Sequence, residues 1–271
     1  MAVIERRDLK PGVVELRLNR PDRLNAITFE LLTSLIEHID AIEGDDTVRV
    51  VVITGEGRGF CSGADLKGDP ASRSRMPEGF TRPGVIGMLR QTEWYAEAVV
   101  RMHRLDKPII AAVNGPATGG GLAFVLGADI RIAAESARFA ASFVKAGLSG
   151  CDMGVSWLLP RVVGAGNAHQ LMLTGRVIDA RRALDIGLVV DVVPDDQLHA
   201  RVLEEAELIV GNTPWGVEMT KRVMWDNLET PSFTAAISLE ARTQTLTTTT
   251  ADNREAVNAW GERRPPSFDL A

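Results

Sequence analysis

Two glycine-rich turns constrain the fold of this chain more than any other feature of its sequence. Residues 55–63 follow the β-branched, mostly apolar run 48–54, and residues 115–121 follow the apolar run 108–113. Short runs of this composition are typical of buried strands. Each turn also precedes a short helix, so the sequence predicts two strand–turn–helix units.

The start of each short helix offers backbone N–H groups that have no intrahelical partner and lie at the positive end of the helix dipole. Two such groups converging on one point would form an oxyanion hole. The alternative is that both turns are tight connections that merely need glycine. Nucleotide binding is not supported, because Phe60 and Phe124 occupy the last position of the Rossmann fingerprint and Gly121 replaces the lysine of a P-loop.

The rest of the chain predicts an α/β protein whose first half alternates strands with helices and whose second half is mostly helical. In the first half we expect strands at 13–19 and 129–134, helices at 28–43 and 89–105, and a surface loop at 67–87. In the second half we expect helices at 164–173, 179–186, 195–210, 215–228, 233–250 and 253–262. These elements predict a core of ββα units at 1–195 and a helical region at 196–271.

Composition and charge exclude several classes of protein. The 271 residues include two cysteines, so the chain is not a disulfide scaffold, and we expect a cytoplasmic protein with reduced thiols. No apolar run approaches the roughly 18 residues of a membrane span, and the N-terminus lacks the apolar core of a signal peptide. The net charge of -6 argues against a general nucleic-acid binder. We therefore expect neither a membrane nor a nucleic acid as a partner.

Several motifs in sequence order resemble those of one family. Residues 60–66 (FCSGADL) resemble the oxyanion-loop motif of the enoyl-CoA hydratase/isomerase (crotonase) superfamily. Residues 107–115 and 119–121 are similar to its second oxyanion segment. Further similar segments are 19–21 with 24–26, 173–176, 183–184, 187–189 and the ending 263–268. The resemblance thus covers nearly the whole chain.

The resemblance implies a crotonase-like (ClpP/crotonase) spiral of ββα units with a C-terminal helical trimerisation region. It also implies a homotrimer or a hexamer (dimer of trimers), an acyl-CoA thioester substrate, and no metal or redox cofactor, since coenzyme A is part of the substrate. By motif position the oxyanion N–H groups fall on Ala64 and Gly120, where they would stabilise a thioester enolate. The resemblance implies substrate binding by Arg23, Leu24, Ala26, Cys61, Asp65, Leu66, Gly119, Ala123 and Phe143.

The chain departs from the family where hydratases carry two catalytic glutamates. In those enzymes one glutamate activates the attacking water and the other manages the proton at the α-carbon. The corresponding positions here are Ala123 and Phe143, and neither 107–128 nor 136–151 contains Asp or Glu. The reaction therefore stays open between enoyl or dienoyl isomerisation, aryl-CoA-type chemistry, and acyl-CoA binding with reduced catalysis.

Asp152 is the one acid left beside these two segments. It precedes a predicted helix that starts near Val155, so it is a candidate for catalysis, for capping the helix, or for both. A carboxylate beside a helix N-terminus should have a lowered pKa, which would suit a nucleophile or hydrogen-bond acceptor. On the helix 89–105, Glu93 and Glu97 are further candidates for the acyl pocket.

Overall fold

The computed structural model describes residues 2–67 and 83–268, and its centre is a six-stranded sheet. The strand order is β1-β2-β3-β4-β6-β9, in which β1 is antiparallel to β2 and every other neighbouring pair is parallel. The strands are β1 (Ile4–Lys10), β2 (Val13–Leu18), β3 (Val50–Gly55), β4 (Ile109–Val113), β6 (Ile130–Ala134) and β9 (Asp191–Val193). A second sheet has the order β5-β7-β8, with strands β5 (Ala117–Thr118), β7 (Arg138–Ala140) and β8 (Ile178–Asp179).

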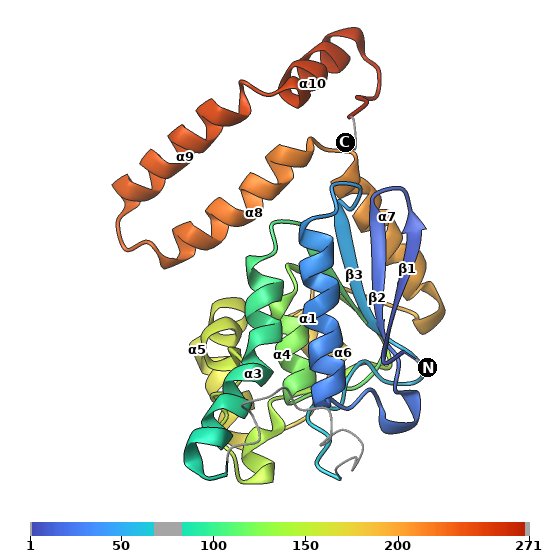
Figure 1. Cartoon of the computed structure of the whole chain (residues 1–271), viewed down its shortest axis with the longest axis vertical. Helices are drawn as coiled ribbons and strands as arrows, with labels where there is room; N and C mark the ends of the chain where they lie inside the picture. Colours follow the sequence, from blue (N-terminus) through green and yellow to red (C-terminus); the bar gives the residue numbers. More distant parts are fainter. Residues whose placement is uncertain (1, 68–82, 269–271) are drawn as a thin grey trace.

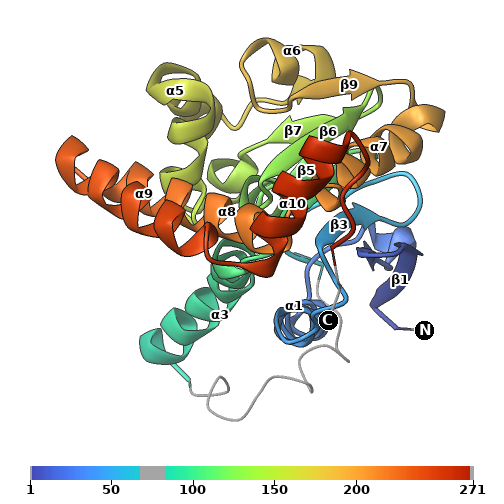
Figure 2. The same cartoon turned by 90° about the horizontal axis from the view of Figure 1, so that it is seen from above.

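Helices cover both faces of the large sheet (Figure 1). Successive side chains of a strand point to opposite faces, and on β2 Val14 and Leu16 face one apolar cluster while Val13 faces another. The first cluster is packed by α1 (Phe29–Glu43), α3 (Val85–Arg104), α4 (Gly120–Gly127) and α5 (Val155–Thr174). The second is covered by α7 (Leu198–Val210), and Figure 2 shows α7 on the side of the sheet opposite to α1 and α3. The shorter helices are η1 (Pro21–Arg23), η2 (Ser142–Ala146), α6 (Ala180–Asp185) and η3 (Asp195–Gln197).

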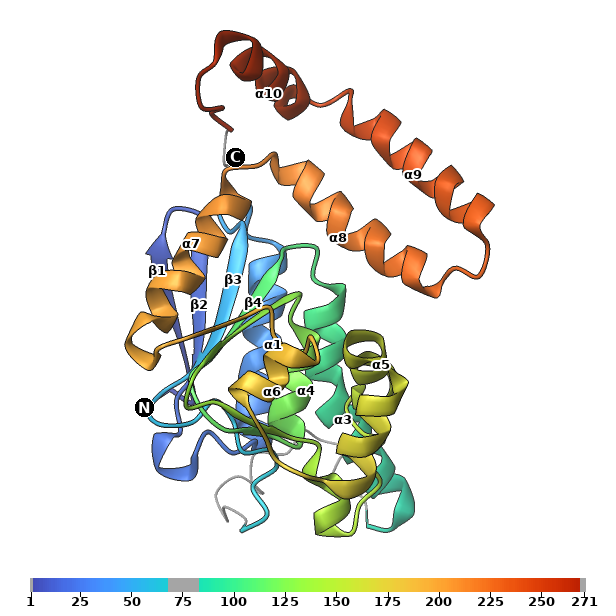
Figure 3. The same cartoon turned by 180° about the vertical axis from the view of Figure 1, so that it is seen from behind.

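The last three helices form a C-terminal arm, α8 (Pro214–Glu229), α9 (Phe233–Thr247) and α10 (Ala251–Glu262), which extends beyond the sheet (Figures 1 and 3). One buried ion pair attaches α8 to the core, since Lys221 Nζ lies 2.8 Å from Asp129 Oδ2. Farther out, Phe233 and Trp260 are 81% and 85% exposed. The arm thus carries large apolar side chains that this single chain leaves uncovered.

The strands and helices predicted from periodicity are present within a few residues, but some strands were missed. These are β1, β5, β7, β8 and β9. Most of the loop predicted at 67–87 lies outside the described residues, and its end was wrong, because α3 already begins at Val85 after Gly84. The helix expected at 164–173 is the second half of α5, which is kinked where Gly164 has a φ of 77°. The proposed boundary between 195 and 196 stays a prediction.

Within the described residues, no helix has the length and apolar character needed to span a membrane. The same part of the chain brings together no group of three or more His, Cys, Asp or Glu side chains that could hold a metal ion.

Candidate active site

The two glycine segments are residues 60–66 and 115–121. The first is fixed by a short parallel pairing between Ile27 and Ala64. The N–H of Ile27 donates to the carbonyl of Gly63 at 2.8 Å, and the N–H of Asp65 donates to the carbonyl of Ile27 at 3.0 Å. In a parallel bridge the flanking residues make the hydrogen bonds, so the N–H of Ala64 itself points away from Ile27. That N–H donates to no acceptor within the described residues.

A second parallel pairing, between Cys61 and Ala117, joins the two glycine segments to each other. The N–H of Cys61 donates to the carbonyl of Pro116 at 3.0 Å, and the N–H of Thr118 donates back to the carbonyl of Cys61 at 3.0 Å. Two segments that are more than fifty residues apart in the sequence therefore form one continuous backbone surface.

Gly63 sits at the contact between these segments. Its φ is +86°, and an added Cβ atom would lie 2.7 Å from the carbonyl oxygen of Thr118 and 3.3 Å from the N atom of Gly120. Gly120 is the first residue of α4, so its N–H has no partner inside the helix. The peptides of Gly63–Ala64 and Gly119–Gly120 are thus neighbours, each with a free N–H.

The next glycines are fixed by the atoms that surround them. A Cβ atom at Gly120 would lie 2.6 Å from Cδ1 of Ile27 and 2.9 Å from Sδ of Met153. A Cβ atom at Gly121 would overlap the carbonyl oxygen of Cys61. The Cys61 carbonyl belongs to the backbone, so only glycine fits at position 121, whereas a side chain at position 120 would have to displace the ends of the Ile27 and Met153 side chains.

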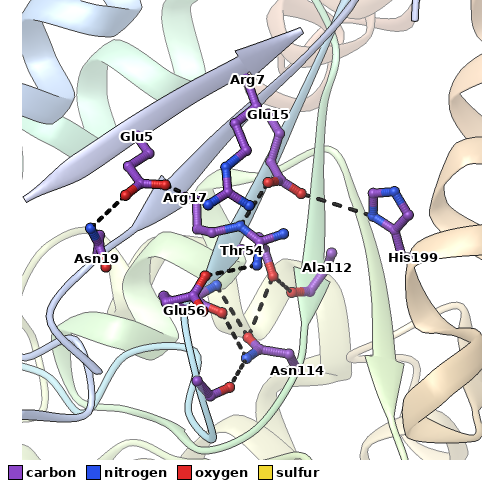
Figure 4. Close-up of polar contacts among 12 residues, drawn as sticks. Glu5, Arg7, Glu15, Arg17, Asn19, Thr54, Glu56, Ala112, Asn114 and His199 are labelled. Atoms are coloured by element: carbon purple, nitrogen blue, oxygen red, sulfur yellow. Dashed lines mark hydrogen bonds and ion pairs between the residues drawn. The ribbon is translucent and has the colours of Figure 1, made fainter. Parts of the chain in front are cut away.

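The turn that leads into the first glycine segment is held by asparagine side chains. Asn114 Nδ2 donates to the carbonyls of Gly55 and Gly57 at 2.8 and 2.9 Å, and its Oδ1 accepts the N–H of Gly55 at 3.2 Å. Figure 4 shows this amide beside Thr54 and the turn. Asn25 Nδ2 binds the same turn through the carbonyl of Gly59 at 2.8 Å.

Asp65 links residues 23–26 to residues 61–66, the two segments expected to hold coenzyme A. Its carboxylate lies 3.1 Å from Nη2 of Arg20 and 3.0 Å from Nη2 of Arg23. Burial acts to raise the pKa of Asp65, but hydrogen bonds and charge from the two arginines outweigh it and leave the pKa lowered. Asp65 is therefore an ionised anchor of the loop.

The other residues predicted to bind substrate differ widely in exposure. Leu66 and Arg23 are exposed beside Asp65. The side chains of Ala26, Cys61, Ala123 and Phe143 are buried, as is Gly119, and Leu24 is intermediate with a φ of 49°. Burial raises the pKa of the Cys61 thiol to about 12, so this thiol stays protonated and unreactive at neutral pH.

Asp152 does not cap α5, which corrects one of the roles expected for it. The N-cap residue is Gly154, and the helix has no side-chain cap. The Asp152 carboxylate accepts instead the N–H of the next residue, Met153, at 2.8 Å. The expected lowering of the pKa is also wrong: burial raises the pKa of Asp152, against a smaller lowering by the Met153 N–H. A carboxyl with a raised pKa is suited to giving and taking protons.

Met153 connects Asp152 to the glycine segments. Its φ of 47° is unusual for a residue with a side chain, and its Sδ is one of the atoms that crowd Gly120. Asp152 is therefore the sequence neighbour of a residue whose side chain lies beside Gly120.

Of the two candidate glutamates on α3, Glu97 is held in an ion-pair network. Glu97 Oε1 accepts from Nε of Arg101 at 2.7 Å, and Arg101 also binds Asp40 of α1 at 2.9 Å. Glu93 is exposed. Tyr95, which no sequence motif singled out, lies between them on another side of the helix and packs against the main apolar cluster. The sequence signal that could have found Tyr95 is its four-residue spacing from buried Val99, which places both residues on the same face of α3.

Comparison with known proteins gives one consistent result. A family model described as enoyl-CoA hydratase/isomerase matches residues 8–270. The chain is 42% identical over 262 residues to a probable enoyl-CoA hydratase (echA12) of Mycobacterium bovis, covering 96% of this chain and 90% of that protein. It is 38% identical over 260 residues to the 1,2-epoxyphenylacetyl-CoA isomerase of Escherichia coli, covering 96% of each. A crystal structure of a probable enoyl-CoA hydratase/isomerase from Mycobacterium abscessus matches with a TM-score of 0.91 at 36% identity, covering 99% of each chain.

The sheet, the joined glycine segments and these matches define a protein of the crotonase fold, as the resemblance implied. The chain belongs to the enoyl-CoA hydratase/isomerase family and is an enzyme that acts on acyl-CoA thioesters.

Proposed function

We propose that this enzyme isomerises an unsaturated acyl-CoA by moving one proton along the acyl chain, with Asp152 as its single acid–base group. The observation that carries the proposal is the position of Asp152, next to the residue that contacts Gly120, with a pKa raised by burial. The hydratase positions hold the buried apolar side chains of Ala123 and Phe143. Similarity to a solved enoyl CoA isomerase from M. smegmatis supports the same reaction class.

In the proposed mechanism the thioester oxygen accepts hydrogen bonds from the N–H groups of Ala64 and Gly120. The Asp152 carboxylate removes a proton from the α-carbon of a β,γ-unsaturated thioester, and the C–H electron pair moves onto the thioester oxygen, giving a conjugated enolate. The two N–H donors stabilise this charge, and one such donor typically contributes about 3–4 kcal/mol. Protonated Asp152 then returns the proton two carbons along the chain, so the double bond moves and the carboxylate is regenerated.

One carboxyl group suffices for this reaction, whereas hydration needs one group to activate water and another to protonate carbon. As proposed, the reaction uses only the thioester and groups of the protein, without a metal or redox cofactor. A nucleophilic attack on an aryl ring is less well supported, because a raised pKa lowers the fraction of ionised carboxylate.

Asp152→Asn tests the proposal, because asparagine can still accept the Met153 N–H but is a poor base. Purified enzyme is incubated in D₂O with enoyl-, dienoyl-, hydroxyacyl- and aryl-CoA thioesters, and mass spectrometry follows deuterium uptake and product formation. We expect the wild type to isomerise or exchange at least one thioester, and Asp152→Asn to be at least about a hundredfold slower, which is about 2.7 kcal/mol. Cys151→Ser is the matched control, since Cys151 is the exposed neighbour. Binding without turnover in the wild type would instead indicate a catalytically reduced acyl-CoA binder.

We also propose that the enzyme is cytoplasmic and assembles as a trimer or a dimer of trimers through the C-terminal arm. The uncovered Phe233 and Trp260 support this assembly, because large apolar side chains gain free energy when a partner buries them. Light scattering at micromolar concentration that shows only monomers would contradict it.

A further inference from the structure

Tyr95 is the one tyrosine of the chain, and it packs from α3 against the main apolar cluster. On one side its ring makes an edge contact with Phe29, with 5.5 Å between the ring centroids. Phe29 begins α1 two residues after Ile27, which pairs with Ala64 and contacts Gly120. Tyr95 therefore approaches the site from the side of the oxyanion loop.

The face of α3 that carries Tyr95 leads to the turn that carries Asp152. Val99, one helical turn after Tyr95, lies on the same face of α3, and a Cβ atom at Gly154 would be 3.8 Å from its Cγ1. Burial raises the pKa of the Tyr95 phenol, and the negative charges of Asp65 and Asp152 raise it further. The phenol therefore stays protonated, and a hydrogen-bond donor, at neutral pH.

The Tyr95 hydroxyl has no acceptor in the described part of the chain. The side chains that surround its ring from Phe29, Val99 and the main cluster are apolar. Buried and half-buried tyrosine hydroxyls usually have a hydrogen-bond partner. A hydroxyl donor that has no acceptor among the described residues is available to a ligand atom.

We propose that the Tyr95 hydroxyl recognises an oxygen atom on the acyl chain, so that the site prefers acyl-CoA thioesters carrying a hydroxyl, keto or epoxide oxygen beyond the thioester carbonyl. The inference rests on the proposed function in one respect: the thioester oxygen must lie at Ala64 and Gly120. The acyl carbons then extend toward Asp152, and Tyr95 is the donor between that residue and the loop. Sites that bond a substrate hydroxyl discriminate strongly against analogues that lack it.

A binding cycle tests Tyr95 without requiring turnover. Calorimetry measures the affinity of wild type and Tyr95→Phe for butyryl-CoA, 3-hydroxybutyryl-CoA and 4-hydroxybutyryl-CoA. We expect the wild type to bind at least one hydroxylated ligand about tenfold more tightly than butyryl-CoA, the size of one neutral hydrogen bond. Tyr95→Phe should lose this preference and keep both its melting temperature and its affinity for butyryl-CoA, because phenylalanine preserves the ring contact with Phe29.

The outcomes separate this inference from the proposed function. If butyryl-CoA binds but wild type and Tyr95→Phe show the same preference, or no preference, the role of Tyr95 is wrong and the proposed isomerase is unaffected. If Tyr95→Phe weakens all three ligands equally, Tyr95 only shapes the pocket, which also overturns the inference. If no thioester binds the wild type, the acyl-CoA site itself is wrong and both proposals fail.

Discussion

The two walls of the candidate site are built on different principles. The glycine wall, residues 60–66 and 115–121, offers backbone N–H groups, and its glycines at 63, 120 and 121 are fixed by atoms closer than a Cβ allows. The acid wall, residues 151–154 with the inner face of α3, offers side chains, above all those of Asp152 and Tyr95. A substitution in the glycine wall leaves the backbone N–H donors in place and can only crowd them. A substitution in the acid wall replaces the functional group itself. The family's glycine motifs are therefore retained in this chain, whereas its catalytic glutamates are not.

Hydration of crotonyl-CoA is the strongest test of the acid wall. Because Ala123 and Phe143 replace both glutamates, and each general acid or base typically contributes about 10²–10⁴-fold, we expect hydration at least about 10⁴-fold slower than in efficient hydratases. The loss of enoyl absorbance measures the rate. A rate comparable to that of an efficient hydratase would show that another group supplies the missing chemistry.

Gly63→Ala is the strongest test of the glycine wall. The new methyl group would contact the carbonyl of Thr118 and press on the N atom of Gly120, so the gap between the two N–H donors should close. We expect kcat/KM to fall by about 10²–10³, the effect of losing one oxyanion donor. Steady-state kinetics on the best substrate of the thioester panel measures this.

Gly147→Ala is the matched control for that substitution. Gly147 also has a positive φ, +76°, but no atom lies within 4 Å of an added Cβ. Alanine at position 147 therefore has the same kind of backbone strain as alanine at position 63, but its methyl group contacts no other atom. Equal losses in the two variants would show that strain, rather than closure of the glycine wall, is responsible.

The sequence predicted the glycine wall well for a physical reason. Several glycines in a turn after a buried strand indicate that other backbone atoms approach closely, and the packing shows what each glycine avoids, such as the Cys61 carbonyl at Gly121. The acid wall was predicted less well. The position of Asp152 was found, but its pKa and its capping role were wrong, because both depend on burial and on where α5 begins. The sequence also did not show that Arg101 binds Glu97.

In the fold, too, some elements were predicted from the sequence and others were not. Long strands and helices have a periodic pattern that the sequence displays, as in α1 with its Thr28 cap. Strands of two or three residues, such as β5, β8 and β9, carry too few side chains to form a pattern and depend on tertiary contacts. The direction of the C-terminal arm depends on the pairing of Lys221 with Asp129, which are 92 positions apart and which no local signal connects.

Asn114→Ala tests how far the glycine wall depends on the turn behind it. The substitution leaves the carbonyls of Gly55 and Gly57 without their donor, which should cost about 1–3 kcal/mol of unfolding free energy. We expect kcat/KM to fall about tenfold, since the loop carrying Ala64 is loosened but not blocked. Asn167→Ala is the control, because that amide also binds a backbone carbonyl, of Val163, but on α5. Similar kinetic losses in both variants would contradict a specific role for the turn.

The smallest expected effect is the pH dependence that Asp152 gives to the acid wall. Because its pKa is raised in the folded enzyme, kcat/KM should fall with decreasing pH at a higher pH than the value of about 3.9 at which an ordinary aspartate titrates. The same shift acts on stability: the protonated form favours folding, so this contribution is fully present below the ordinary pKa and is lost as pH rises through the raised one.

Asp152→Asn should therefore melt at the same or a slightly higher temperature than the wild type at neutral pH, and the difference should shrink as pH falls toward 4. Melting curves across this range measure the effect, with Cys151→Ser as the control. A variant that melts well below the wild type at neutral pH would show that ionised Asp152 stabilises the turn before α5, and the acid wall would then be structural rather than chemical.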